Sequence, residues 1–131
     1  LDNGMLRVID YKTGGMSLEI SGVESMFNGK AQYPLQTMLY SMVLYRTLHR
    51  NVEPALYFAR KMKKSTYSPR VIDMARGRYE VDYATYAEEF EEALRAKLLE
   101  LFNPEIPFTC CEYKGIYSPC TYCDYKVICK R

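Results

Sequence analysis

Short apolar runs along the chain alternate with longer segments of helical periodicity. The first run, from Met5 to Tyr11, predicts a β-strand. Because Ile9 breaks a strict alternation of apolar and polar positions, we expect this strand to be buried on both faces. A second run, from Pro54 to Arg60, predicts another strand, and the segment from Val71 to Val81 predicts strand pieces interrupted at Gly77. These runs supply the strands of a sheet.

Two long segments have the periodicity of amphipathic helices. The first extends from Gln32 to His49, and Pro34 fits its first turn, where a missing N–H costs no hydrogen bond. The second begins after Asp82, which has the character of an N-cap, and runs to about Phe102. The apolar stripe of the first helix is predicted to comprise Leu35, Met38, Leu39, Met42, Val43 and Tyr45, with Arg46 and Thr47 continuing its spacing. That of the second comprises Tyr86, Phe90, Leu94, Leu98 and Leu101.

The remaining segments complete the predicted architecture. Thr13 to Lys30 is rich in Gly, Ser and Asn and predicts a loop with one helical turn near Val23 to Phe27. From Glu105 onward there is little periodicity, and this tail holds all five cysteines. The pattern favours an α/β fold: a mixed sheet core with a long helix packed on it, a second long helix and a cysteine-rich C-terminal tail. We expect a core portion over residues 1–104 and a tail over residues 105–131.

Composition narrows the class of protein. A length of 131 residues suggests one domain, and a net charge of +2 is too small to indicate nucleic-acid binding by itself. No apolar run reaches the ~20 residues that span a bilayer, and no signal-peptide pattern is present, so we expect no membrane association. Asn3-Gly4 is a hairpin signal with no strand before it. We therefore expect the chain to be the C-terminal part of a longer polypeptide.

Asp10 and Lys12 form the first candidate site. On a strand, residues two apart project to the same side, so both side chains face one site. A carboxylate there can bind Mg²⁺, and a lysine beside it can stabilise a phosphate oxygen or orient a water, which suits metal-assisted phosphodiester hydrolysis. The alternative is an ordinary surface ion pair at the end of a strand.

Gln36 and Tyr40 form the second candidate. Their spacing of four places them on one helix face, with Gln32 a turn earlier on the same face. This polar stripe interrupts an otherwise apolar helix. The alternative is that it is the solvent-facing edge of that helix.

The cysteines form the third candidate. Cys120 and Cys123 are separated by two residues, and Cys129 follows after five more, which suits thiolates around one metal centre. A zinc site usually shows two close pairs, and three clustered thiolates with one distant ligand favour a [4Fe–4S] cluster. The fourth ligand is Cys110, Cys111 or a residue outside the chain. Reduced, buried thiols are the alternative, and the odd cysteine count argues against a disulfide framework and for a reducing, cytoplasmic compartment.

A basic stretch follows the second strand. Its cations are Arg60, Lys61, Lys63 and Lys64, with Arg70, Arg76 and Arg78 further along. They suit phosphate contacts or, equally, a solvated loop.

Taken together, these motifs resemble the RecB-like branch of the PD-(D/E)XK nuclease superfamily, in particular AddB-type domains. The matching elements are the strand Leu6 to Gly14, which contains Asp10-Tyr11-Lys12, the helical Gln36-x3-Tyr40, and Cys120-x2-Cys123-x5-Cys129. The resemblance implies a restriction-endonuclease-like fold and an Mg²⁺- (or Mn²⁺-) dependent DNA exonuclease of recombination or repair, working with a helicase.

The resemblance also implies a role for each matching residue. Asp10 would be a metal ligand, the Tyr11 carbonyl a further ligand and Lys12 the catalytic lysine. Gln36 and Tyr40 would line the active site and hold DNA or the lysine. The three matching cysteines, Cys120, Cys123 and Cys129, would bind the [4Fe–4S] cluster.

The chain also departs from the family pattern. A second metal-binding aspartate and the first cluster cysteine would lie upstream of Leu1, so we expect this chain alone to be inactive. The alternative function is a non-catalytic DNA-binding module that retains the nuclease fold. The presence of both Asp10 and Lys12 favours the enzyme.

Overall fold

The computed structural model describes residues 5–14, 17–29, 31–63, 66–107 and 119–128. The chain separates into two compact units, Leu1–Leu99 and Glu100–Arg131. All the strands and both long helices begin in the first unit. The second unit contains the 3₁₀ turn η2, Pro119–Tyr122.

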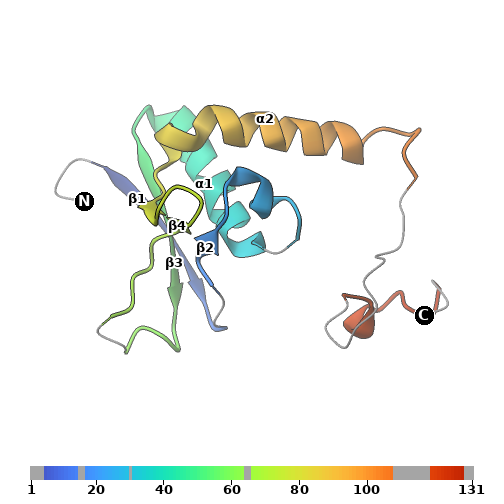
Figure 1. Ribbon diagram of the computed structural model, residues 1–131, viewed down its shortest axis with the longest axis horizontal. Helices are drawn as coiled ribbons and strands as arrows, with labels where there is room; N and C mark the ends of the chain where they lie inside the picture. Colours follow the sequence, from blue (N-terminus) through green and yellow to red (C-terminus); the bar gives the residue numbers. More distant parts are fainter. Residues whose placement is uncertain (1–4, 15–16, 30, 64–65, 108–118, 129–131) are drawn as a thin grey trace. The chain divides into compact units, whose positions relative to one another are not determined.

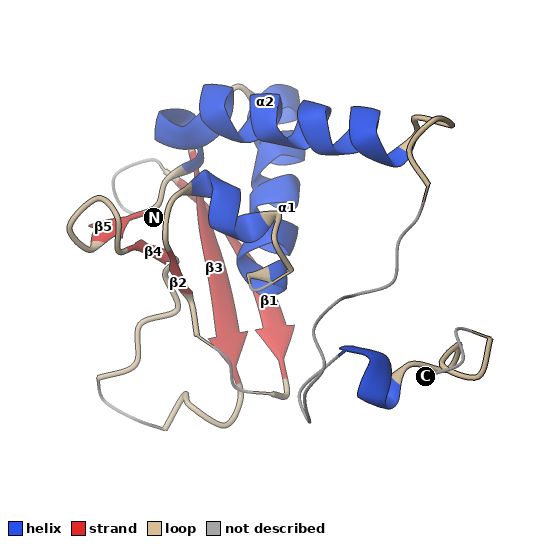
Figure 2. Ribbon diagram, turned by 45° about the vertical axis from the view of Figure 1, so that its right-hand side comes forward, coloured by secondary structure: helices blue, strands red, loops and turns tan. Residues whose placement is uncertain are grey.

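Two parallel strands form the centre of the first unit. β1 (Leu6–Lys12) pairs with β3 (Val52–Phe58) in a register that runs from Leu6 opposite Val52 to Lys12 opposite Phe58. Parallel neighbours need a crossover connection, and here α1 (Gln32–Leu48) provides it and packs on both strands. Figure 2 shows the two strands side by side with their carboxyl ends at the same edge. Functional side chains on these strands and on α1 are therefore brought to one place.

A smaller mixed sheet belongs to the same unit and lies beside β1 and β3. β2 (Glu19–Ile20) pairs in parallel with β4 (Ile72–Asp73), which pairs in the antiparallel sense with β5 (Tyr79–Glu80). The 3₁₀ turn η1 (Val23–Met26) follows β2, as the sequence predicted for this region. The strand β2 itself was not predicted, because two residues inside a polar segment carry no periodic signal. The combination of parallel and antiparallel strands with long helices is the mixed α/β architecture that the sequence predicts.

The second long helix, α2 (Tyr83–Leu101), begins at the predicted cap. Asp82 Oδ1 accepts a hydrogen bond from the Thr85 backbone N–H at 3.1 Å, which satisfies one of the free donors of the first turn. Of the predicted apolar face, Tyr86 and Phe90 are buried, together with Tyr83, which was not part of the prediction. Leu98 and Leu101 are exposed, so the periodic pattern continues past the part of the helix that packs on the core.

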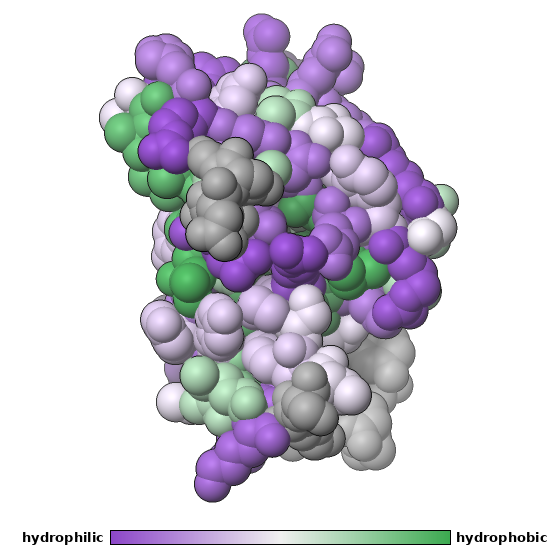
Figure 3. Space-filling model, turned by 90° about the vertical axis from the view of Figure 1, so that its left-hand side faces the viewer, coloured by the Kyte–Doolittle hydropathy of each residue, from purple (hydrophilic) through white to green (hydrophobic). Residues whose placement is uncertain are grey.

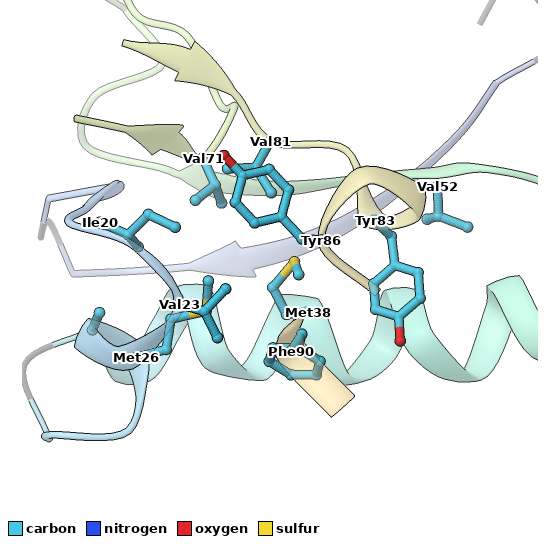
Figure 4. Close-up of a cluster of buried hydrophobic side chains, with 11 residues drawn as sticks. Ile20, Val23, Met26, Met38, Val52, Val71, Val81, Tyr83, Tyr86 and Phe90 are labelled. Atoms are coloured by element: carbon cyan, nitrogen blue, oxygen red, sulfur yellow. The ribbon is translucent and has the colours of Figure 1, made fainter. Parts of the chain in front are cut away.

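The core lies between α1, α2 and the strands (Figure 4). It is formed by side chains that are at most 7% exposed: Ile20, Val23, Met26, Ala31, Met38, Val52, Val71, Val81, Tyr83, Tyr86 and Phe90. On α1 the buried positions are Pro34, Thr37, Met38 and Ser41, whereas Val43, Arg46 and Thr47 of the predicted stripe are exposed. Thr37 and Ser41 are tolerated in the core because each hydroxyl bonds a backbone carbonyl of the preceding turn.

β1 is not buried on both faces, contrary to the prediction. Leu6 and Val8 pack against the core on the side of α1, but Ile9 is 39% and Tyr11 69% exposed on the other side. The Tyr11 ring stacks on Tyr57 of β3, with ring centroids 5.7 Å apart. The apolar residues of the outer face thus form a cross-strand pair at the surface.

Candidate active site

Asp10 and Lys12 lie at the carboxyl end of β1 and face α1. Lys12 Nζ is 2.9 Å from Asp10 Oδ2, and the two side chains are only 21% and 18% exposed. The strand period of two brings them together, as predicted. Their burial is deeper than that of an ordinary surface ion pair, which was the alternative for this motif.

The helix supplies the next partner. Gln36, in the second turn of α1, accepts a hydrogen bond from Lys12 Nζ through its Oε1 at 2.8 Å. Its Nε2 donates to the Tyr40 hydroxyl one turn later, at 2.6 Å. The predicted grouping of these four residues in one place is therefore present, and the Gln–Tyr face is not merely a solvent-facing edge. Gln32, which was predicted to extend the stripe, is exposed instead.

Tyr33 is the member of this group that sequence reasoning missed. Lys12 Nζ lies over its ring, 5.0 Å from the centroid. Tyr33 precedes Gln36 by three residues, so the same helical spacing that linked Gln36 to Tyr40 could have found it.

Asp10 has the chemistry of a metal ligand. Its Oδ2 is buried and, in the described part of the chain, receives no hydrogen bond, because Lys12 Nζ has the distance of an ion pair but not the direction of a hydrogen bond. A buried carboxylate oxygen with no hydrogen-bond donor has a lone pair available for a cation. Alternate residues of a strand direct their backbone N–H and C=O groups to the same edge. The Leu6 N–H and the Lys12 carbonyl both form hydrogen bonds at the edge of β1 that pairs with β3, so the even-numbered residues face that edge. The Tyr11 carbonyl accordingly points to the other edge of β1.

These oxygen donors suit Mg²⁺, which takes one or two carboxylates and keeps several waters. Among the described residues, no group of three or more His, Cys, Asp or Glu side chains is arranged to hold a metal ion. The chain therefore offers Asp10 and a backbone carbonyl, which fit a hydrated Mg²⁺ but not an all-protein cage.

The predicted basic residues separate into two kinds. Arg70 pairs with Glu53 and Glu80, and Arg76 Nη2 is 2.7 Å from a carboxylate oxygen of Glu89. These guanidinium groups are bound within the protein, and Arg78 Nη1 also lies 3.9 Å from a Glu19 carboxylate.

On the face shown in Figure 3 hydrophilic side chains predominate, and apolar residues appear as separate small patches.

The loop after β3 carries two exposed cations among its described residues. Arg60 and Lys63 are exposed, while Lys61 Nζ lies 5.2 Å from the centre of the Phe58 ring. The loop starts at the active-site edge, because Ala59 N–H donates to the Lys12 carbonyl at 2.9 Å. Lys64 lies outside the described residues. Arg60 and Lys63 are thus exposed cations on a loop that begins at the edge where Lys12 lies.

The cysteines are described only in part. Cys120 and Cys123 are half-buried and form no disulfide with a described residue, and the Cys123 backbone N–H donates to the Cys120 carbonyl at 3.4 Å. Cys110, Cys111 and Cys129 lie outside the described residues, so the convergence of the cysteines stays a prediction.

Comparison with known protein families identifies a superfamily for this chain. The family model described as PD-(D/E)XK nuclease superfamily matches residues 1–130. No curated protein and no solved structure matches the chain. No helix in the described ranges combines the length and apolar character needed to cross a membrane.

Proposed function

Because the chain belongs to the PD-(D/E)XK nuclease superfamily, we propose that it is a metal-dependent deoxyribonuclease that hydrolyses phosphodiester bonds. The observation that carries this proposal is the arrangement at the end of β1. Lys12 is held between Asp10 and Gln36, and the buried Asp10 oxygen has no hydrogen-bond donor in the described part of the chain. Membership of the superfamily indicates nuclease activity, and this arrangement supports the more specific proposal of metal-dependent DNA cleavage.

Asp10 Oδ2 and the Tyr11 carbonyl would hold Mg²⁺ or Mn²⁺, the ions that nucleases of this superfamily generally use. The ion supplies Lewis-acid stabilisation of charge on the phosphoryl oxygens. Lys12 donates from its ammonium to a phosphate oxygen, or orients the attacking water, from a fixed position. Gln36 limits the directions that the ammonium can take, and Tyr40 in turn fixes the Gln36 amide. The cations of the loop after β3 contact the DNA backbone.

The proposal extends to the kind of nuclease. The order and spacing of the three sequence motifs support a RecB-like, AddB-type exonuclease of DNA recombination or repair, acting in the cytoplasm with a helicase. Cys120, Cys123 and Cys129 would bind a [4Fe–4S] cluster in the full-length protein. Anaerobically purified protein should then be brown, with broad absorbance near ~400 nm. Colourless protein with stoichiometric zinc would overturn the cluster and leave the nuclease proposal standing.

The experiment is a cleavage assay on end-labelled DNA with the full-length protein and Mg²⁺. Asp10→Ala should abolish cleavage, because it removes the side-chain metal ligand. Lys12→Ala should lower kcat by about 10²–10³-fold, the loss typical of one charge-stabilising donor, while Mg²⁺ still binds. Glu92→Ala and Arg95→Ala are matched controls, because they remove one exposed charge each from α2 and should cleave at the wild-type rate.

Circular dichroism would show that each variant is folded. Wild-type rates for folded Asp10→Ala would rule out the proposed mechanism. If the protein then bound DNA without cutting it, the non-catalytic DNA-binding module would be the correct assignment.

A further inference from the structure

Among the described residues the ammonium group of Lys12 has three partners, and two of them belong to the motifs that the sequence analysis identified. Asp10 Oδ2 is 2.9 Å from Nζ, and Gln36 Oε1 is 2.8 Å away. The third partner is the face of the Tyr33 ring, whose centroid is 5.0 Å from Nζ. A cation within about 6 Å of an aromatic centroid is attracted by the negative face of the ring.

The Tyr33 ring is held in place by the fold. Tyr33 lies in the first turn of α1 and packs on Phe58, with ring centroids 6.0 Å apart and an interplanar angle of 57°. Phe58 is fully buried at the end of β3, directly opposite Lys12 in the strand register. The ring is therefore positioned by two elements, α1, to which it belongs, and β3, which it contacts through Phe58.

We propose that Tyr33 is a positioning residue, whose ring face holds the Lys12 ammonium between Asp10 and Gln36. The inference rests on the proposed function in that Lys12 is the residue that acts on the phosphate. A lysine has four rotatable side-chain bonds and loses much rotamer freedom when it is fixed. The ion pair with Asp10 and the hydrogen bond to Gln36 leave the ammonium free to swing toward the side that the ring occupies. The ring closes that side without offering a competing hydrogen bond.

This role makes different demands on the ring and on the hydroxyl group. Cation–π attraction needs the aromatic face but not the phenolic oxygen, so Tyr33→Phe should preserve it. Tyr33→Leu keeps an apolar side chain against Phe58 and removes the π-system. A residue that only filled space beside Phe58 would show similar behaviour in both variants. Tyr45→Leu is the matched control, because Tyr45 is a half-buried ring on the same helix that packs on Tyr83 instead.

The first measurement does not depend on cleavage. In protein labelled with ¹³C-lysine, the Lys12 ε-methylene resonance is assigned by its absence in Lys12→Arg. We expect it to be shifted upfield by the ring current in wild type, Tyr33→Phe and Tyr45→Leu, and to return toward the free-lysine position in Tyr33→Leu. A Lys12 resonance that is unchanged in folded Tyr33→Leu would overturn the proposal.

The second measurement is steady-state cleavage. Tyr33→Leu should lower kcat by about 3- to 30-fold, the range that corresponds to one partly desolvated cation–π contact, with KM for DNA unchanged. Tyr33→Phe should restore the wild-type kcat. Equal defects in Tyr33→Phe and Tyr33→Leu would overturn the proposal in favour of a role for the hydroxyl group. A wild-type protein that does not cleave DNA would overturn the proposed function, and the resonance alone would then decide whether Tyr33 holds Lys12.

Discussion

Two aspartates, the half-buried Asp10 and the fully buried Asp73, differ in how many hydrogen bonds they receive. Asp73 is fully buried, and its Oδ1 accepts from the backbone N–H groups of Gly22 at 3.0 Å and Ala75 at 2.9 Å. Its Oδ2 accepts from the Tyr86 hydroxyl at 3.0 Å. Asp10, by contrast, has a buried Oδ2 with no hydrogen bond from the described residues and one lysine beside it.

The difference shows what each carboxylate does. Asp73 ties together three separate elements: η1 through Gly22, β4 through its own backbone, and α2 through Tyr86. Buried polar groups in native proteins are almost always hydrogen-bonded, and Asp73 follows that rule because it is part of the fold. Asp10 departs from it, because its Oδ2 lies beside the Lys12 ammonium and receives no hydrogen bond from the described residues. A saturated carboxylate stabilises the fold, and an unsaturated one is available for a ligand.

The largest expected effect on stability comes from removing Asp73. Asp73→Ala leaves two backbone N–H groups and one hydroxyl without partners in the core, so the free energy of unfolding should fall by about 3–5 kcal/mol. Asp10→Ala should change it by less than about 1 kcal/mol, since its oxygen receives no hydrogen bond. Urea denaturation followed by circular dichroism measures both. Equal losses for the two variants would break the comparison.

The next largest expected effect is stabilisation of the native state by Mg²⁺, which should depend on Asp10. An ion that binds only the native state stabilises it by about 2.7 kcal/mol at 100 times its Kd. The Tm of the wild type should therefore rise when Mg²⁺ is added and fall back when EDTA removes the ion. The Tm of Glu92→Ala should behave in the same way. Asp10→Ala should lose the shift. A full shift in Asp10→Ala would place the ion elsewhere.

Tyr86→Phe tests the Asp73 network without removing the carboxylate. The hydroxyl of Tyr86 points toward the strands in Figure 4, and burial together with the Asp73 carboxylate raises the pKa of this phenol. Its loss should lower the free energy of unfolding by about 1–2 kcal/mol, because Asp73 Oδ2 stays buried. Tyr83→Phe is the matched variant: Tyr83 donates to Glu91, whose side chain is 29% exposed, so water replaces the lost bond. Urea denaturation should show the smaller loss for Tyr83→Phe.

The smallest expected effect concerns a third aspartate, the α2 cap. Burial alone would raise the pKa of Asp82, but hydrogen bonds from Asn51 and Thr85 outweigh it and lower the pKa below its ordinary value of 3.8. The cap therefore contributes stability above about pH 4 and loses it as the pH falls through the lowered pKa. Asp82→Ala should cost about 1 kcal/mol near neutral pH. Urea titrations at several pH values should show this cost shrinking in acid, and a cost that does not change with pH would contradict an ionised cap.

Local signals in the sequence were enough for the long elements and for most of the site. The periodic segments became α1 and α2 within one or two residues of the predicted ends, and the strands that contain Asp10 and Leu56 were located from their apolar runs. A period of two placed Asp10 beside Lys12, and a spacing of four placed Gln36 beside Tyr40. These relations follow from backbone geometry alone, so they hold wherever the element is placed.

Relations between elements are different in kind. That Lys12 meets Gln36 and Tyr33 depends on how α1 crosses β1, and that Asp73 is saturated depends on η1 and α2 meeting at β4. The exposure of Ile9 and Tyr11 likewise depends on what covers the outer face of β1, which no local pattern encodes. The sequence by itself determined which side chains share a face of one element. Only the tertiary structure decided which of those faces meet, because packing sets the burial and hydrogen bonding between distant segments. Packing gives Asp73 hydrogen bonds to both carboxylate oxygens and leaves Asp10 Oδ2 without one from the described residues.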